Sequence, residues 1–149
     1  MNMNGNEYFV QVTEQIRLSY AHLLKMYIQL CQKYKLFRKR NNEEEMKKYF
    51  HLVDQYFYDE TGKINWNNIH PLIPPNIEKN IKNEYSELNE KEIRLCCLLL
   101  FDVPVADISE ILLYTQRSIY SITHRIKLKT GMTDIRKNLN KLLLNERIG

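Results

Sequence analysis

A seam of mostly apolar residues runs through the first quarter of the chain, with spacings that alternate between four and three. This 3.5-residue repeat, held for about four heptads, is typical of a long helix that pairs with another helix. We therefore expect residues 1–58 to form a helical region that holds two chains together as a homodimer. The expected dimerisation residues are Phe9, Ile16, Tyr20, Leu23, Tyr27, Leu30, Tyr34 and Phe37, with Thr13 completing the seam.

The same seam also fits a helix that packs against its own domain. Tyrosine at three seam positions is unusual in a tight two-stranded coil, because the ring is bulky and its hydroxyl needs a partner. Leu24, Ile28 and Cys31 widen the apolar stripe, which favours burial on more than one face, in a bundle or a dimer. A second helix with a broad aromatic face is expected over residues 43–58.

Residues 59–85 read as a connector. A turn is expected at Thr61 and Gly62, and three prolines between positions 71 and 75 exclude a continuous helix. Trp66 and Ile69 are apolar enough to pack, so the segment is expected to be an ordered strap. A short helix is possible over residues 76–85.

Residues 86–149 carry the signals of four short helices. Asn89 can cap the first helix together with Glu92 in a capping box. A break at residues 102–104 leads to a short second helix. Thr115 caps a third helix, which should end at about Thr130 before Gly131, and Thr133 is expected to cap the fourth.

Composition supports an all-α fold, because the chain has only 4 Gly and 4 Pro in 149 residues and 44% hydrophobic residues. It lacks an apolar run long enough for a membrane span, and its first residues do not resemble a secretory signal, so we expect a cytoplasmic protein that does not contact membranes. The four histidines are scattered and the three cysteines lack a metal-ligand spacing. We therefore expect neither an enzyme nor a protein with a metal or other cofactor.

The net charge of +4 is modest, but the charges are unevenly distributed. Residues 86–112 contain six acids and two bases, whereas residues 113–141 contain seven bases and one acid. A basic segment beside an acidic one produces a one-sided field that suits a polyanion, although a solvated charged helix has the same composition.

The third expected helix, residues 116–130, has one apolar face and one polar face. At about 100° per residue, Ile119, Ile122 and Ile126 lie together and should face the core. The opposite face offers donors and acceptors suited to base edges in a major groove. The base-reading candidates are Arg117, Tyr120, Ser121 and His124, and the phosphate-contacting candidates are Arg125, Lys127 and Lys129. Two short helices joined by a tight turn, the second exposed and basic, define a helix-turn-helix.

These motifs resemble the LuxR/FixJ-type C-terminal effector domain over residues 87–132, most closely its Bacteroidetes version. The matching positions are Leu88, Glu92, Cys96, Leu98, Ile108, Leu112, Thr115, Ser118, Ile119, Arg125, Ile126, Lys127, Lys129 and Gly131. The resemblance implies a four-helix fold that binds double-stranded DNA through its third helix, commonly as a dimer. Thr123, Leu128 and Thr130 depart from the family pattern, which removes two expected phosphate contacts.

Two alternatives to a DNA-binding transcriptional regulator remain open at this stage. The helix-turn-helix can serve as a protein-interaction module with weak or no DNA binding, whose aromatic helices engage another regulator. A sigma-factor-like domain that recruits RNA polymerase has a similarly built helix-turn-helix. Salt-dependent binding to DNA would distinguish a DNA-binding regulator from a protein-interaction module.

Overall fold

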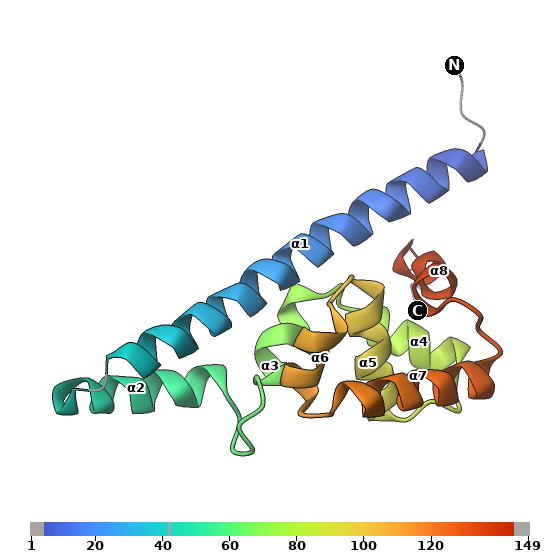
Figure 1. Cartoon of the computed structure of the whole chain (residues 1–149). Helices are drawn as coiled ribbons and strands as arrows, with labels where there is room; N and C mark the ends of the chain where they lie inside the picture. The colour runs from blue at the N-terminus through green and yellow to red at the C-terminus, as the bar shows by residue number, and fades with distance from the viewer. Residues whose placement is uncertain (1–4, 42, 145–149) are drawn as a thin grey trace.

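The computed structural model describes residues 5–41 and 43–144, and its regular elements within those ranges are all helical (Figure 1). The extended pairing in the described residues is limited to an isolated bridge between Tyr58 and Ile64. The predicted all-α fold class is therefore confirmed.

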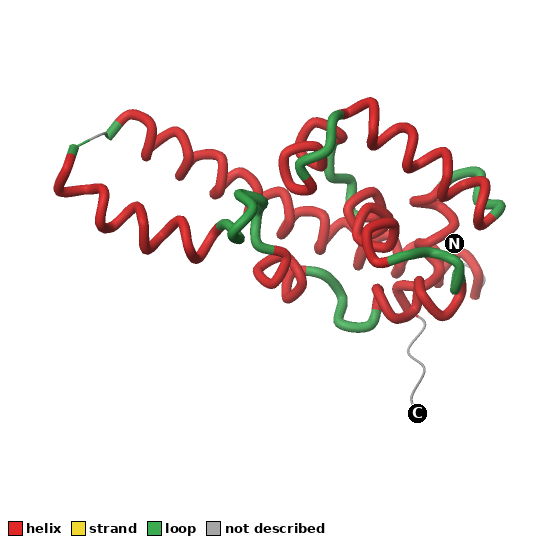
Figure 2. Tube along the Cα trace, turned by 90° about the horizontal axis from the view of Figure 1, so that it is seen from below, coloured by secondary structure: helices red, strands yellow, loops and turns green. Residues whose placement is uncertain are grey.

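The two N-terminal helices form an antiparallel hairpin. Helix α1 spans Gly5–Arg40 and helix α2 spans Glu44–Phe57. The end of the hairpin extends beyond the other helices, where these two helices lie beside each other and no other described element covers them (Figures 1 and 2). The single long helix predicted from the apolar seam is thus present, and the second helix lies within the predicted residues 43–58.

The apolar seam of α1 divides into two rows. The tyrosine row packs within the chain: the ring of Tyr20 lies 5.9 Å from that of Phe101, and the ring of Tyr34 lies 5.3 Å from that of Phe57. The ring of Tyr27 lies 6.2 Å from the same Phe57 ring. The other row is exposed, apart from the half-buried Ile16; its exposed members are Phe9, Leu23, Leu30 and Phe37. Contacts within the chain thus occupy the three tyrosines, and the ring of Phe37 in the second row lies 6.0 Å from that of Phe50. That the eight seam residues hold a second chain stays a prediction.

The connector is ordered and belongs to the same core as the rest of the body. It contains helix α3, Trp66–Ile69, a 3-10 turn, His70–Leu72, and helix α4, Ile77–Glu84. Ile69, Ile77 and Ile81 are fully buried. One cluster of buried side chains runs from Leu24 of α1 through the connector to Leu142, so the three sequence regions do not form three separate cores.

The C-terminal region contains helices α5, Glu90–Leu100, α6, Val105–Leu112, α7, Gln116–Thr130, and α8, Ile135–Asn140, followed by the 3-10 turn Lys141–Leu144. The expected capping box of Asn89 and Glu92 opens α5. Helix α8 is capped by the Asp134 side chain, not by the predicted Thr133. The last five residues of the predicted domain 86–149 lie outside the described residues.

Candidate nucleic-acid interface

Helices α6 and α7 form a helix-turn-helix whose turn is held by three local features. Leu113 ends α6 in the left-handed conformation, with φ of 53°. The Ser109 hydroxyl donates a hydrogen bond to the carbonyl of Tyr114. The Thr115 side chain accepts a hydrogen bond of 3.0 Å from the backbone N–H of Ser118 and so caps α7. Together these contacts set the direction in which α7 leaves the turn.

Helix α7 presents the face that its sequence predicts. Ile119 and Ile126 are 1% and 0% exposed, which confirms the predicted helical phase. All four predicted base-reading residues are exposed: Arg117, Tyr120, Ser121 and His124. Leu128 is 73% exposed on the same side of the helix. Helix α1 runs along the opposite side of the body, so it leaves this face uncovered (Figure 1).

Two of the three predicted phosphate-contacting residues pair with a buried carboxylate inside the domain. The Glu92 side chain is only 1% exposed, and Lys129 Nζ lies 2.8 Å from its Oε1 and 3.0 Å from its Oε2. Arg125 Nε lies 3.3 Å from Oε2. Lys129 therefore acts as the counter-ion of Glu92. Arg125 remains 57% exposed at its side chain and has further N–H groups that are available to a phosphate.

The carboxyl group of Glu92 is kept ionised despite its burial. Burial alone raises the pKa of a carboxyl group, but the backbone N–H of Asn89 and the ammonium of Lys129 outweigh it, and the pKa of Glu92 falls below its ordinary value. The same carboxylate thus completes the capping box of α5 and fastens the C-terminal half of α7 to it.

Lys127, the third predicted phosphate-contacting residue, differs from Arg125 and Lys129 because it does not pair with Glu92. Lys127 is half-buried, and within the described residues neither it nor Arg117 has an ion-pair partner. Their charges are therefore not neutralised by a neighbouring carboxylate. These two residues and Arg125 make up the cationic surface of α7.

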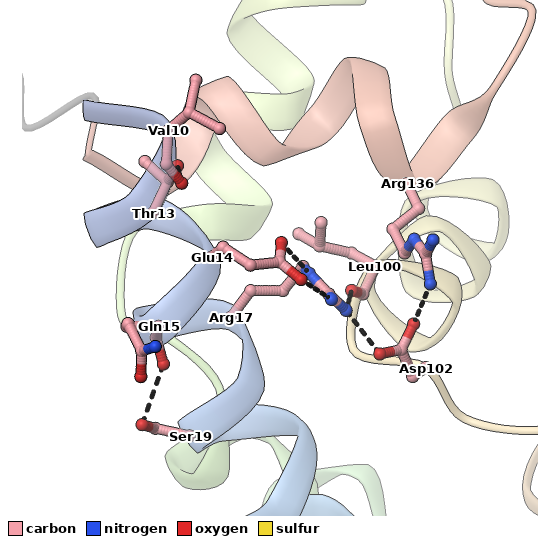
Figure 3. A network of polar contacts seen from close by, with 9 residues as sticks. All are labelled: Val10, Thr13, Glu14, Gln15, Arg17, Ser19, Leu100, Asp102 and Arg136. Carbon is pink, nitrogen blue, oxygen red and sulfur yellow. Dashed lines mark hydrogen bonds and ion pairs between the residues drawn. The ribbon is translucent and has the colours of Figure 1, made fainter. Parts of the chain in front are cut away.

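A polar network that sequence analysis did not identify ties α1 to the helix-turn-helix domain (Figure 3). Arg17 is 4% exposed and pairs with Asp102 in the loop between α5 and α6, as well as with Glu14 one turn earlier. Arg136 of α8 reaches the same carboxylate, with Nη1 2.8 Å from Oδ1 of Asp102. Arg136 belongs to the basic segment counted in the sequence, but its charge is directed at Asp102.

Asp102 shows why this loop can hold two guanidinium groups. Its backbone has φ of 60°, a left-handed conformation that aspartate tolerates better than most residues. Burial raises the pKa of its carboxyl group, but hydrogen bonds from Arg136 and Arg17 outweigh this and lower it. No signal near either residue in the sequence points to the contact between Arg17 and Asp102, because 85 positions separate them.

The three cysteines are core residues in this structure. Cys31, Cys96 and Cys97 are buried free thiols. Burial raises the pKa of Cys96 to about 12 and moves that of Cys97 well above its ordinary value. These thiols therefore stay protonated at neutral pH and contribute packing to the domain that carries α7.

No family model, curated protein or solved structure matches the chain. Within residues 5–41 and 43–144, no helix is both long enough and apolar enough to cross a membrane. The same described residues contain no group of three or more His, Cys, Asp or Glu side chains suited to holding a metal ion. The class of ligand must therefore be inferred from the chemistry of the exposed faces.

Proposed function

We propose that this protein binds double-stranded DNA in the cytoplasm through α7 and regulates transcription. The observation that carries the proposal is the outer face of α7, where hydrogen-bonding side chains lie exposed on a helix whose direction is set by a capped turn. A helix held in this way can enter the major groove with its polar face toward the base edges. The resemblance of residues 87–132 to the LuxR/FixJ-type effector domain supports the same function.

The proposed roles follow the chemistry of each side chain. Arg117, near the start of α7, can bind guanine in a bidentate manner. Ser121 and His124, one turn apart on the exposed face, can donate to or accept from base edges, and Tyr120 beside them can contact either a base or the sugar-phosphate backbone. Lys127 and Arg125 flank this row as phosphate contacts. Lys129, predicted as a third phosphate contact, has a structural role in this proposal because Glu92 holds its ammonium.

Fluorescence anisotropy with labelled duplex DNA at several salt concentrations tests the proposal. Neutralising Z phosphates gives a slope of about −0.9Z in a plot of log K against log salt. We expect Arg125→Ala and Lys127→Ala each to lower this slope, while Lys25→Ala, on the helix at the opposite side of the body, leaves it unchanged. Binding without salt dependence, or equal effects of all three changes, would reject the proposal.

A second candidate function is a protein-interaction module that engages another regulator. The observation in its favour is the apolar content of the α7 face, where Leu128 is 73% and Tyr120 is 61% exposed. Such side chains are common in protein interfaces and are rarer on a face that meets only phosphates. This candidate predicts that Leu128→Ser abolishes capture of a partner protein, whereas the DNA-binding proposal predicts at most a change at one thymine.

A further inference from the structure

The projecting hairpin has two chemically different faces. Tyr34 of α1 stacks on Phe57 of α2 in its interior. To one side of this contact lie Arg38 and Asp54, whose charged groups are 2.7 Å apart, and the Tyr34 hydroxyl donates to the same carboxylate at 2.7 Å. Helical phase at about 100° per residue puts Leu30 on the other side, next to the exposed tyrosines of α2.

This second side is here named the apolar hairpin face. It consists of Leu23, Leu30 and Phe37 of α1 and Tyr49, Leu52 and Tyr56 of α2. Their exposed fractions lie between 47% and 64%, so most of these residues leave half or more of their surface exposed within the described chain. The charged side chains on the polar side of the hairpin are well solvated by water. The large side chains of the apolar hairpin face are not, so burying them against another surface is favourable.

Exposure of large apolar side chains is concentrated on the hairpin. Sixteen such residues are exposed in the described chain, and twelve of them belong to α1 or α2. The remaining helices leave only four exposed, although they and their connections make up more than half of the described residues. Six of these twelve make up the apolar hairpin face, and the other six lie elsewhere on α1, so the exposed apolar surface belongs to these two helices and not to the molecule as a whole.

The area of this face matches that of a stable interface. With roughly 200 Å² for the surface of a large side chain, the exposed fractions of its six members sum to roughly 700 Å² of apolar surface. Monomers rarely exceed a largest patch of about 300–600 Å². A specific interface of standard size buries about 800 Å² on each partner, so a single partner of similar size can cover the face.

The pattern of α1 favours a second copy of this chain as that partner. The row Phe9, Ile16, Leu23, Leu30 and Phe37, exposed apart from the half-buried Ile16, has a strict seven-residue repeat, which fits a partner helix of comparable length. Helix α1 has 36 residues and carries this row itself. A two-fold interface uses the same surface on both copies and closes without leaving apolar surface behind.

Charge along α1 selects the direction of pairing. The first turn of the helix contains Glu7, and the last turn contains Arg38, Lys39 and Arg40. In an antiparallel pair centred on Leu23, Phe37 lies opposite Phe9 and Lys39 lies opposite Glu7. In a parallel pair, the three cations of one copy would lie beside those of the other, and like charges at close range oppose association.

We propose that two copies associate through the seven-residue row of α1, with the α1 helices antiparallel and the two-fold axis near Leu23. The apolar hairpin face of each copy then lies against the N-terminal half of α1 in the other copy. The α2 helix of each copy adds its tyrosines to the contact at one end of the α1 pair, so that each half of the interface contains three helices rather than a bare coiled coil. This inference does not depend on DNA binding by α7, and DNA is absent from its test.

Sedimentation velocity of the full chain at micromolar concentration tests the association. We expect the wild type to be a dimer and the double variant Leu30→Glu/Tyr56→Glu to be a monomer with an unchanged helical circular-dichroism signal, because both side chains are exposed in one copy. The control His51→Glu/Gln55→Glu adds two acids at exposed positions on the polar side of the hairpin, beside Arg38 and Asp54, and should remain dimeric. A monomeric wild type, or a double variant that still dimerises, would overturn the proposal.

Cysteine cross-linking tests the direction. A mixture of Ile16→Cys and Leu30→Cys proteins should form a disulfide between the two variants under mild oxidation, because antiparallel pairing puts these positions opposite each other. The three native cysteines are buried and serve as the background in the wild-type protein. Efficient cross-linking of Leu30→Cys to itself, without the mixed product, would show parallel pairing and overturn the antiparallel arrangement.

Discussion

Replacing Glu92 with glutamine removes one negative charge from a fully buried position while keeping the shape of the side chain. Glutamine can still accept the backbone N–H of Asn89, so the capping box is largely retained. The contacts to Oε2 are lost, one from Lys129 and one from Arg125, and the remaining contact of Lys129 with Oε1 loses its ionic character. The amide NH₂ of glutamine also faces this ammonium and cannot accept from it.

The expected loss of stability depends on the burial of the Glu92 carboxylate and on the partial exposure of Lys129. Removing one partner of a fully buried ion pair typically costs about 3–5 kcal/mol. Here the carboxylate is buried, but Lys129 is 34% exposed and its ammonium can turn toward water. The free energy of unfolding should therefore fall by about 2–4 kcal/mol, which for a chain of this size lowers Tm by about 5–15 °C.

Urea unfolding followed by circular dichroism measures this difference, and Glu90→Gln is the matched control. Glu90 lies on the same helix, is 76% exposed at its side chain and forms an ion pair at i,i+4 with Arg94 within the described residues. Its replacement should change the free energy of unfolding by less than about 0.5 kcal/mol. A Glu92→Gln protein as stable as the control would show that the buried pair adds no net stability.

The pH dependence provides an independent check on Glu92. Its pKa is lower in the folded chain than the ordinary value of 4.5, so the ionised carboxylate stabilises the fold above that value. This contribution is lost as the pH falls through the folded-state pKa. The difference between wild type and Glu92→Gln should therefore be constant near neutral pH and shrink below about pH 4. A difference that grows in acid would contradict the assignment.

Three further predictions concern α7. Ile126→Ala should lower the free energy of unfolding by about 2–5 kcal/mol in urea titrations, because the side chain is fully buried. His124→Ala and Ser121→Ala should each alter sequence preference by about 1–3 kcal/mol at one base pair. Competition binding with DNA duplexes that differ by single base pairs measures this change, and uniform weakening on all sequences would contradict base reading. Lys127→Ala should lower the salt slope of DNA binding by about one, whereas Lys129→Ala should act mainly on thermal stability; an equal slope change for both would contradict the structural role of Lys129.

Local signals in the sequence predicted the helices of the C-terminal region and the buried and exposed faces of α7. The capping box of Asn89 and Glu92, the Thr115 cap and the left-handed Gly131 each depend on residues within a few positions of one another. The apolar period of α7 likewise predicted its buried and exposed faces. The cap of α8 was wrong by one residue, because Thr133 and Asp134 are both good caps and only the backbone path selects between them.

Contacts between distant residues were decided by the tertiary structure alone. The sequence shows Lys129 as a cation on a basic helix, but packing of α5 on α7 brings it to a carboxylate 37 positions away. The seam of α1 shows its repeat equally well in both rows, and only folding directs the tyrosine row inward, against Phe57 and Phe101. A helical repeat specifies which residues share a face, whereas the surface that the face meets depends on where the rest of the chain packs.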